Sequence, residues 1–98
     1  PPFVHQALLR AEASQLDTAL DFLARAKAAA ATLDYPVVLF DPVEAQMMRH
    51  SGKERAQLLV QSSSRRALQG FLTAWHAMLS AQQGGKARWY LDVDPIEF

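Results

Sequence analysis

The clearest pattern along the chain is a pair of alternating apolar runs within residues 43–61, one on each side of a polar tip. Alternation of apolar and polar positions is typical of β-strands that bury one face, and a glycine between two such runs favours a tight turn. The apolar positions are Val43, Ala45 and Met47 in the first run and Ala56, Leu58 and Val60 in the second. We therefore predict a β-hairpin with its tip at His50, Ser51 and Gly52.

One strand-like and one helix-like segment precede this hairpin, and its first strand starts at residues 37–40. Residues 3–13 alternate imperfectly between apolar and polar side chains, which predicts a first strand. Residues 16–33 carry apolar side chains at helical spacing and are rich in alanine, so we predict a helix there. The β-branched run at residues 37–40 begins the next strand. Because Pro42 cannot donate a hydrogen bond to a central ladder, we place that strand at an edge of the sheet.

A second helix and a last strand follow the hairpin. The serines at 62–64 form a polar segment that favours the capping of a helix. The clearest helical stripe of the chain comes next and contains Leu68, Phe71, Leu72, Trp75, Met78 and Leu79. Gly84 and Gly85 end it, and residues 87–93 alternate as a strand. Its two faces are predicted to be Ala87, Trp89, Leu91 and Val93 on the apolar side and Arg88, Tyr90 and Asp92 on the polar side.

The resulting order of elements, β-α-β-β-α-β, indicates an α+β fold. We predict a ferredoxin-like arrangement, in which two helices cover one face of a four-stranded antiparallel sheet. The 98 residues, half of them apolar, suffice for one modest core and are too few for two. Residues 1–98 are therefore interpreted as a single domain. Because the chain starts at Pro1 without a methionine, we expect it to be a fragment of a longer protein.

Composition argues against several classes of protein. Without cysteine, the chain has no disulfide framework, thiolate metal site or nucleophilic thiol. No apolar run approaches the roughly 20 residues that cross a bilayer, so we expect a soluble, intracellular protein without a membrane partner. A glycine-rich phosphate loop is absent, so this chain is not expected to bind ATP by itself. The three histidines, His5, His50 and His76, lack the spacing of metal ligands.

Two aspartates are the candidates for catalysis. Asp92 and Asp94 are two residues apart, so on a strand they would share a face and could act as a general acid and base. A solvated strand end accounts for the same residues, and we favour that interpretation. We therefore predict no catalytic residue, no metal and no cofactor in this chain.

The formal net charge is zero, but the charges are unevenly distributed. Residues 1–48 carry three basic and six acidic side chains, residues 49–91 carry seven and one, and residues 92–98 carry none and three. The middle block thus has a net charge of +6. We expect its cations to lie along one connected surface that attracts an anionic partner. A solvated surface whose charges cancel in space is the alternative.

The hairpin tip carries the first group of candidate binding residues. Arg49, Lys53 and Arg55 surround it, and long cationic side chains there could reach phosphates while the strands stay fixed in the core. Protection of an edge strand by charge is the alternative interpretation. On the last strand, Tyr90 is the candidate for stacking on a base, because Trp89 has the parity of the apolar face.

The start of the second helix carries another group, Arg65, Arg66 and Gln69. Arg65 and Gln69 are four residues apart and share one helical face, where they could bind a carboxylate. The dipole at a helix N-terminus adds to the attraction for an anion. Arginine is mildly disfavoured at that end of a helix, which favours a functional over a stabilising role for these side chains.

Four stretches of the sequence together resemble a known family. They are PPFVHQALLRAEA at the start, MMRHSGKERAQLLVQ in the hairpin, SSRRALQ at the second helix and RWYLDVDP at the end. In order and spacing they are similar to the C-terminal domain of primosomal protein N′, the family of bacterial replication-restart DNA helicases known as PriA. The resemblance covers essentially the whole chain.

The resemblance implies a non-catalytic module of an ATP-dependent 3′ to 5′ DNA helicase that recognises stalled forks and reloads the replicative helicase. The parent chain would then be the enzyme and would bind ATP, Mg²⁺ and zinc elsewhere. The implied partners are branched or single-stranded DNA, the acidic C-terminal tail of the single-stranded DNA-binding protein SSB, the helicase core and other primosome proteins. A cytoplasmic, nucleoid-associated location in a bacterium follows. The alternative is a free-standing ferredoxin-like regulatory or ribosome-associated protein.

The resemblance also assigns roles to individual residues. The family's tail-binding arginine and glutamine correspond to Arg65 and Gln69. Its basic hairpin corresponds to residues 49–55, so Arg49, Lys53 and Arg55, together with Arg66, are the expected DNA-binding residues. Two departures weaken the expected DNA binding. Glu54 interrupts the basic hairpin, and Phe40-Asp41-Pro42 stands where many members have a Gly-Pro turn.

Overall fold

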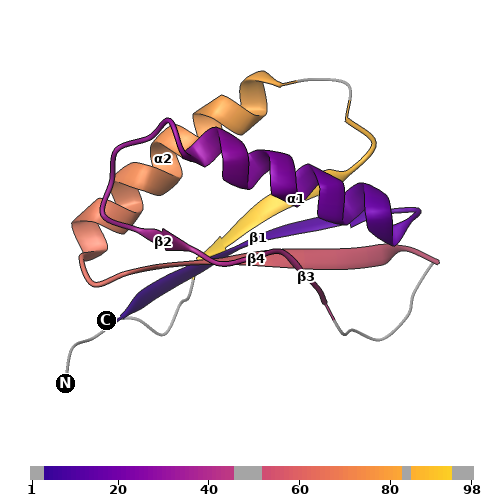
Figure 1. The fold of residues 1–98 in the computed structure, drawn as a ribbon, viewed down its shortest axis with the longest axis horizontal. Coiled ribbons are helices and arrows are strands. Elements are labelled where there is room, and N and C mark those ends of the chain that lie inside the picture. Colours follow the sequence, from indigo (N-terminus) through magenta and orange to yellow (C-terminus); the bar gives the residue numbers. More distant parts are fainter. Residues whose placement is uncertain (1–3, 46–51, 83–84, 94–98) are drawn as a thin grey trace.

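Two helices lie on one face of an antiparallel sheet in the computed structural model, which describes residues 4–45, 52–82 and 85–93 (Figure 1). The elements are β1 (His5–Ala13), α1 (Leu16–Ala30), β2 (Val38–Leu39), β3 (Val43–Glu44), β4 (Glu54–Ser62), α2 (Arg65–Ala81) and β5 (Arg88–Val93). The strand order is β2-β4-β1-β5, and β3 also pairs with β4. The α+β class is confirmed, whereas the sheet formed by these described residues has five strands instead of the four predicted.

The additional strand arises at Asp41-Pro42. Leu39 lies opposite Val60 and Val43 lies opposite Gln57, so this segment advances four residues while β4 advances three. One extra residue turns the following side chains to the other face of a sheet. Val43 therefore lies on the same face as Gln57 and is 52% exposed. The interpretation of Val43 as part of the buried apolar face is wrong for this reason.

The hairpin is confirmed as far as the described residues extend. β3 pairs with β4, and the amide of Ala45 donates a hydrogen bond of 2.9 Å to the carbonyl of Arg55. Gly52 has a φ of 65°, a conformation that glycine adopts without steric cost. Met47, His50 and Ser51 lie outside the described residues, so their predicted places stay predictions.

The core lies between the sheet and the two helices. β1 and β4 alternate strictly, and their inward side chains are buried: Ala7, Leu9, Ala11, Ala13, Ala56, Leu58 and Val60. The predicted stripe of α2 is confirmed, although Met78 is only half-buried. Trp75 is fully buried, and its indole Nε1 donates a hydrogen bond of 3.0 Å to the carbonyl of Ala26. This bond links α2 to α1 inside the core.

The two faces of β5 are as predicted. Trp89 points toward the helices, where its ring stacks on Phe22 of α1 with a centroid distance of 6.2 Å. The ring of His76 on α2 meets Trp89 edge-on at 5.2 Å. Tyr90 lies on the opposite face of the strand and is 59% exposed. The alternation of β5 therefore separates a core aromatic residue from a surface one.

A contact between Lys27 and Asp41 ties the last turn of α1 to the interruption between β2 and β3. Lys27 Nζ donates a hydrogen bond of 2.6 Å to Asp41 Oδ1. This hydrogen bond and the nearby positive charge hold the pKa of Asp41 below its ordinary value. Since the folded pKa is lowered, the contact stabilises the fold above the unfolded pKa, and this contribution is lost as the pH falls through the folded pKa.

We expect an NMR pH titration to give the Asp41 carboxyl a pKa below the ordinary aspartate range. In the Lys27→Met variant both causes of the shift are gone, so the pKa should return to that range. An Asp41 pKa that is the same in both proteins would contradict the contact.

Candidate functional site

Serine side chains fix the corner between β4 and α2. Ser62 is buried, and its hydroxyl donates a hydrogen bond of 2.8 Å to the carbonyl of Pro36 and accepts one of 3.1 Å from the amide of Ser64. Ser64 is the N-cap of α2, and its Oγ accepts a hydrogen bond of 3.0 Å from the amide of Ala67. The predicted capping by this serine segment is confirmed. The first turn of α2 is thus held in a defined position at the end of the sheet.

Arg65, Arg66 and Gln69 are exposed on the first turns of this capped helix. Their side chains form no hydrogen bond or ion pair with the other described residues. The first turn contains no acidic residue, so the two guanidinium groups add to the positive end of the helix dipole. The structure therefore brings these three predicted residues together as donors whose hydrogen-bonding groups face solvent.

The aromatic ring of Tyr35 lies next to this group, and this ring was not predicted from the sequence. A Cβ atom added to Gly70 would lie 2.9 Å from Cε2 of Tyr35, so the missing side chain makes room for this ring. The ring of Tyr35 also meets Phe71 edge-on at 6.2 Å. Arg66 precedes Gly70 by one helical turn and so shares its side of α2. A glycine within a strong helical pattern is the sequence signal that could have pointed to this contact.

The predicted DNA-binding residues at the hairpin differ in their exposure and in their ion pairing. Arg49 lies outside the described residues, and Lys53 is exposed. Arg55 Nε donates a hydrogen bond of 3.1 Å to Glu12 Oε1, and both side chains are about 30% exposed, at 31% and 28%. The charge of Arg55 is therefore already balanced by a carboxylate of β1. Of the described hairpin cations, Lys53 is the one that reaches solvent without an ion pair.

The two groups of predicted cations lie at opposite ends of β4. Lys53 directly precedes this strand, and Arg65 begins the helix that follows it. The strand has nine residues, which corresponds to roughly 30 Å at about 3.3 Å per residue. In Figure 1, α2 begins at one end of the sheet and β4 begins at the other. The expectation of one connected cationic surface is not met, so each group would contact a ligand separately.

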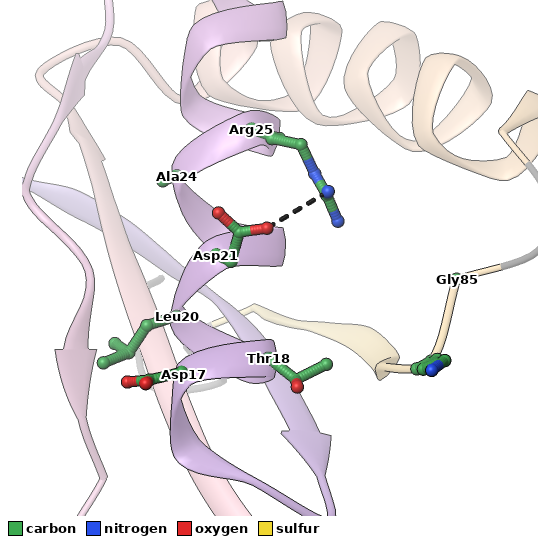
Figure 2. A pocket seen from close by; sticks show the side chains of 8 residues that line it. Asp17, Thr18, Leu20, Asp21, Ala24, Arg25 and Gly85 are labelled. Carbon is green, nitrogen blue, oxygen red and sulfur yellow. Dashed lines mark ion pairs between the residues drawn. The ribbon is translucent and has the colours of Figure 1, made fainter.

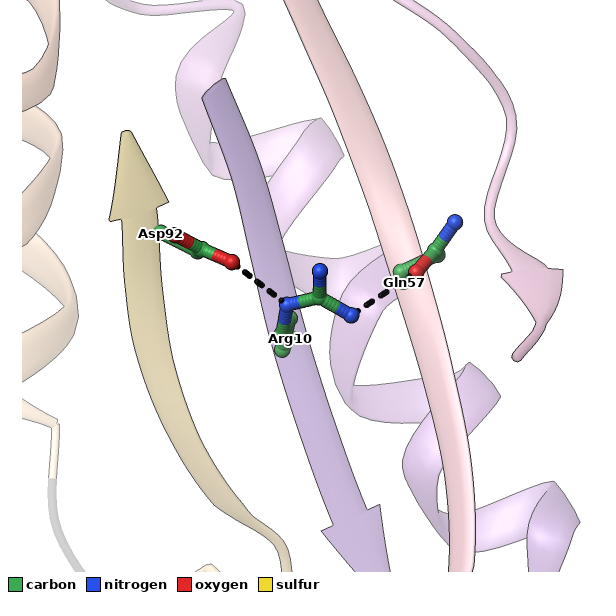
Figure 3. Close-up of polar contacts among 3 residues, drawn as sticks. All are labelled: Arg10, Gln57 and Asp92. Carbon is green, nitrogen blue, oxygen red and sulfur yellow. Dashed lines mark hydrogen bonds and ion pairs between the residues drawn. The ribbon is translucent and has the colours of Figure 1, made fainter. Parts of the chain in front are cut away.

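A polar network crosses the sheet on the face opposite to the helices (Figure 3). Arg10 Nε donates a hydrogen bond of 3.0 Å to Asp92 Oδ2, and Arg10 Nη1 donates one of 3.1 Å to Gln57 Oε1. Asp92 was one of the two candidate carboxylates, and it is an ion-pair partner of Arg10; Asp94 lies outside the described residues. Neither Arg10 nor Gln57 was identified from the sequence, because strand register brings them together.

A hollow of about 770 Å³ lies beside the first turns of α1 (Figure 2). Its charged side chains include Asp17, Asp21, Arg25 and Lys86, so neither sign of charge dominates. Asp21 and Arg25 form an ion pair of 3.1 Å within it. Among the residues that the structure describes, no group of three or more histidine or carboxylate side chains is placed to hold a metal ion.

Comparison with known proteins identifies the family. Residues 1–96 match the family described as the primosomal protein N C-terminal domain. A de novo designed protein, Foldit4, has a similar fold with a TM-score of 0.64, over 97% of this chain and 100% of the designed one. At 4% sequence identity this likeness concerns the fold alone. Within the described ranges, neither helix is long and apolar enough to cross a membrane. Because the family match extends over almost every residue, the chain belongs to the primosomal protein N C-terminal domain family.

Proposed function

We propose that this domain is the non-catalytic docking module of a replication-restart helicase and binds both DNA and the acidic tail of SSB. Membership of the family supports a role in primosomal replication restart, with DNA and other primosome proteins as partners, and hence a location at the nucleoid. The helicase motor, ATP with Mg²⁺ and zinc would belong to other parts of the parent chain. The strand order β2-β4-β1-β5 with both helices on one face supports the ferredoxin-like description of the fold.

The observation that carries the proposal is the group of Arg65, Arg66 and Gln69 at the start of α2. These side chains are exposed, they have no partner among the described residues, and no carboxylate shares the first turn of the helix. Arg65 and Gln69 project from the same helical face, one turn apart. Guanidinium and amide groups in this arrangement donate two hydrogen bonds to one carboxylate. An acidic peptide tail supplies such carboxylates.

A calorimetric titration with a peptide of the SSB tail tests this part of the proposal. We expect saturable binding that weakens with added salt, because the contacts are between charged groups near the surface. A control peptide in which the carboxylates are converted to amides should bind much more weakly. Equal affinity for the two peptides would contradict carboxylate recognition.

The DNA-binding part of the proposal rests on exposed cations at both ends of β4. Lys53 and Arg66 are the described members of the predicted set that reach solvent without an ion pair. Arg49 stays a prediction, and Arg55 is expected to contribute less because Glu12 balances its charge. Forked DNA is the probe of choice, since its two arms present phosphates in more than one direction.

We expect the Lys53→Gln and Arg66→Gln double variant to bind forked DNA with a weaker salt dependence. Each phosphate contact adds about 0.7 to 0.9 to the slope of log affinity against log salt concentration. The slope should therefore flatten by roughly 1.4 to 1.8 units when two contacts are lost. Fluorescence anisotropy at several salt concentrations measures it. The Arg25→Gln variant, which removes a charge from α1, is the control, and an identical slope in the double variant would place the phosphates elsewhere.

A further inference from the structure

The face of the sheet that points away from the helices carries ordered rows of side chains. The pairing of β1 with β4 and β5 puts Gln57, Arg10 and Tyr90 in one row. The next row contains Leu59, Leu8 and Asp92. Side chains directly opposite each other on neighbouring strands are about 5 Å apart, so the rows form a continuous surface. Both described helices lie on the other side of the sheet (Figure 1).

Arg10 is fixed at the centre of this surface. It lies on β1, between β4 and β5, and it is bonded to Gln57 on one neighbour and Asp92 on the other (Figure 3). A guanidinium group has five N–H donors, and these bonds use two of them. The amide oxygen of Gln57 accepts from Arg10, which leaves its NH₂ group to donate. The network therefore holds unused donors in place at the lining of a hollow of about 400 Å³, to which Leu8 and Leu59 also contribute.

Tyr90 places an exposed aromatic ring beside these donors. It lies directly opposite Arg10 in the strand pairing and is 59% exposed. The adjacent row contains Arg55, Glu12 and Arg88, and Arg88 is exposed. The described charged residues of this face are three arginines and two carboxylates. The surface thus combines a stacking platform, fixed hydrogen-bond donors and a small excess of positive charge.

We infer that this face binds a segment of single-stranded DNA, with one base stacked on Tyr90 and a base edge hydrogen-bonded by Arg10 and Gln57. The inference rests on the proposed DNA-binding function and assigns it a second contact surface. Stacking on an aromatic side chain tolerates every base because each has a π-face. A duplex keeps those faces stacked internally, so the platform selects unpaired strands. Arg88 in the next row is placed to meet the backbone phosphates.

A protein partner is the alternative occupant of this face. The cores of protein–protein interfaces are mostly apolar and depleted of carboxylates, although arginine and tyrosine are enriched in them. Here the centre consists of a guanidinium, an amide and a carboxylate, and the exposed apolar residues of the same face, Val38 and Val43, lie at its β2–β3 edge. The polar centre with its surplus of hydrogen-bond donors therefore favours a nucleic-acid strand.

Fluorescence anisotropy with a labelled oligothymidine tests the inference on the 98-residue chain. Tyr90→Ala should weaken binding roughly tenfold, within the range that removal of a stacking aromatic produces. Tyr90→Phe should bind like the unmodified chain because it keeps the ring. Since Tyr90 is exposed, neither substitution disturbs the core. Near-ultraviolet circular dichroism of the core tryptophans verifies that each variant is folded.

A matched pair of arginine variants separates a specific contact from general electrostatics. Arg10→Gln and Arg25→Gln each remove one positive charge, but Arg25 is on α1 and pairs with exposed Asp21 on the other side of the molecule. We expect Arg10→Gln to weaken oligothymidine binding several-fold more than Arg25→Gln. NMR amide shifts on adding the probe should concentrate in β1, β4 and β5.

The possible outcomes distinguish this inference from the function on which it rests. If oligothymidine binds, but the Tyr90→Ala and Arg10→Gln variants bind it as the unmodified chain does, the inference is overturned and the proposed DNA binding stands. If the chain binds neither oligothymidine nor forked DNA, both the inference and the proposed DNA binding fail. A protein is then the remaining candidate partner for this face. Selective loss in the two variants, with shifts confined to the sheet, supports the inference.

Discussion

Replacing Trp75 with alanine is expected to lower the free energy of unfolding by about 3–5 kcal/mol. The side chain of Trp75 is fully buried, its ring lies 5.0 Å from that of Phe71, and its Nε1 bonds the carbonyl of Ala26. Truncation therefore removes apolar contacts, leaves a cavity between α1 and α2 and deletes a link between them. Small domains are stable by only about 5–15 kcal/mol, so much of the total would be lost. Urea unfolding followed by circular dichroism measures the loss.

Two further variants test whether the cost depends on the hydrogen bond of Trp75 and on its full burial. Trp75→Phe keeps an aromatic ring in the core but loses the hydrogen bond to Ala26. It should therefore cost clearly less stability than Trp75→Ala. Trp89→Ala should also cost less, because Trp89 is only partly buried and stacks on Phe22 at the edge of the core. A Trp75→Ala variant that unfolds within about 0.5 kcal/mol of the parent, as surface substitutions do, would contradict this placement of the core.

The parts of the fold that the sequence predicts are those in which one side of an element is buried. The stripe that includes Leu68, Phe71 and Trp75 was recognisable because α2 buries a single face along its length. The alternation of Trp89 and Tyr90 was recognisable for the corresponding reason on β5. In both elements the side-chain pattern follows directly from the helical or strand period, so no knowledge of the partner element is needed.

The interruption at Asp41-Pro42 shows where such patterns fail. Val43 continues the apolar alternation of the sequence, yet the extra residue before it turns its side chain to the uncovered face. An inserted residue changes which face is buried without changing the residue types, so alternation alone does not reveal it. Pro42 indicated an edge position and was the available warning, because proline in a sheet is confined to edges, strand starts and bulges.

The candidate binding residues show the same difference between contacts that are local in the sequence and contacts that are distant in it. Arg65 and Gln69 were grouped correctly from helical spacing, since they are one turn apart on α2. The pairs Arg10–Asp92 and Arg55–Glu12 join residues 82 and 43 positions apart. They depend on strand register, which could not be predicted from the pattern of apolar and polar residues. The net charge of +6 in residues 49–91 therefore overstates the attraction at the hairpin, where Glu12 from outside that block balances Arg55.

Replacing Arg65 with alanine is expected to weaken binding of the SSB-tail peptide by about 1–3 kcal/mol, as for loss of a hydrogen bond to a charged group. Arg65 is exposed at the first position of α2 and has no partner in the described chain, so its removal should not unfold the domain. Titration calorimetry measures the change, and Arg25→Ala on α1 controls for the loss of one positive charge. An unchanged affinity in folded Arg65→Ala protein would remove Arg65 from the site.

A double-mutant cycle with Gln69 decides whether the two residues act on one ligand group. Gln69 lies one turn after Arg65 on the same face of α2, so both side chains should contact the same carboxylate of the peptide. Substitutions that share a partner are non-additive, whereas independent contacts add within about 0.5 kcal/mol. We expect the double alanine variant to lose less affinity than the sum of the two single variants. Strict additivity would mean that Arg65 and Gln69 bind separate parts of the tail.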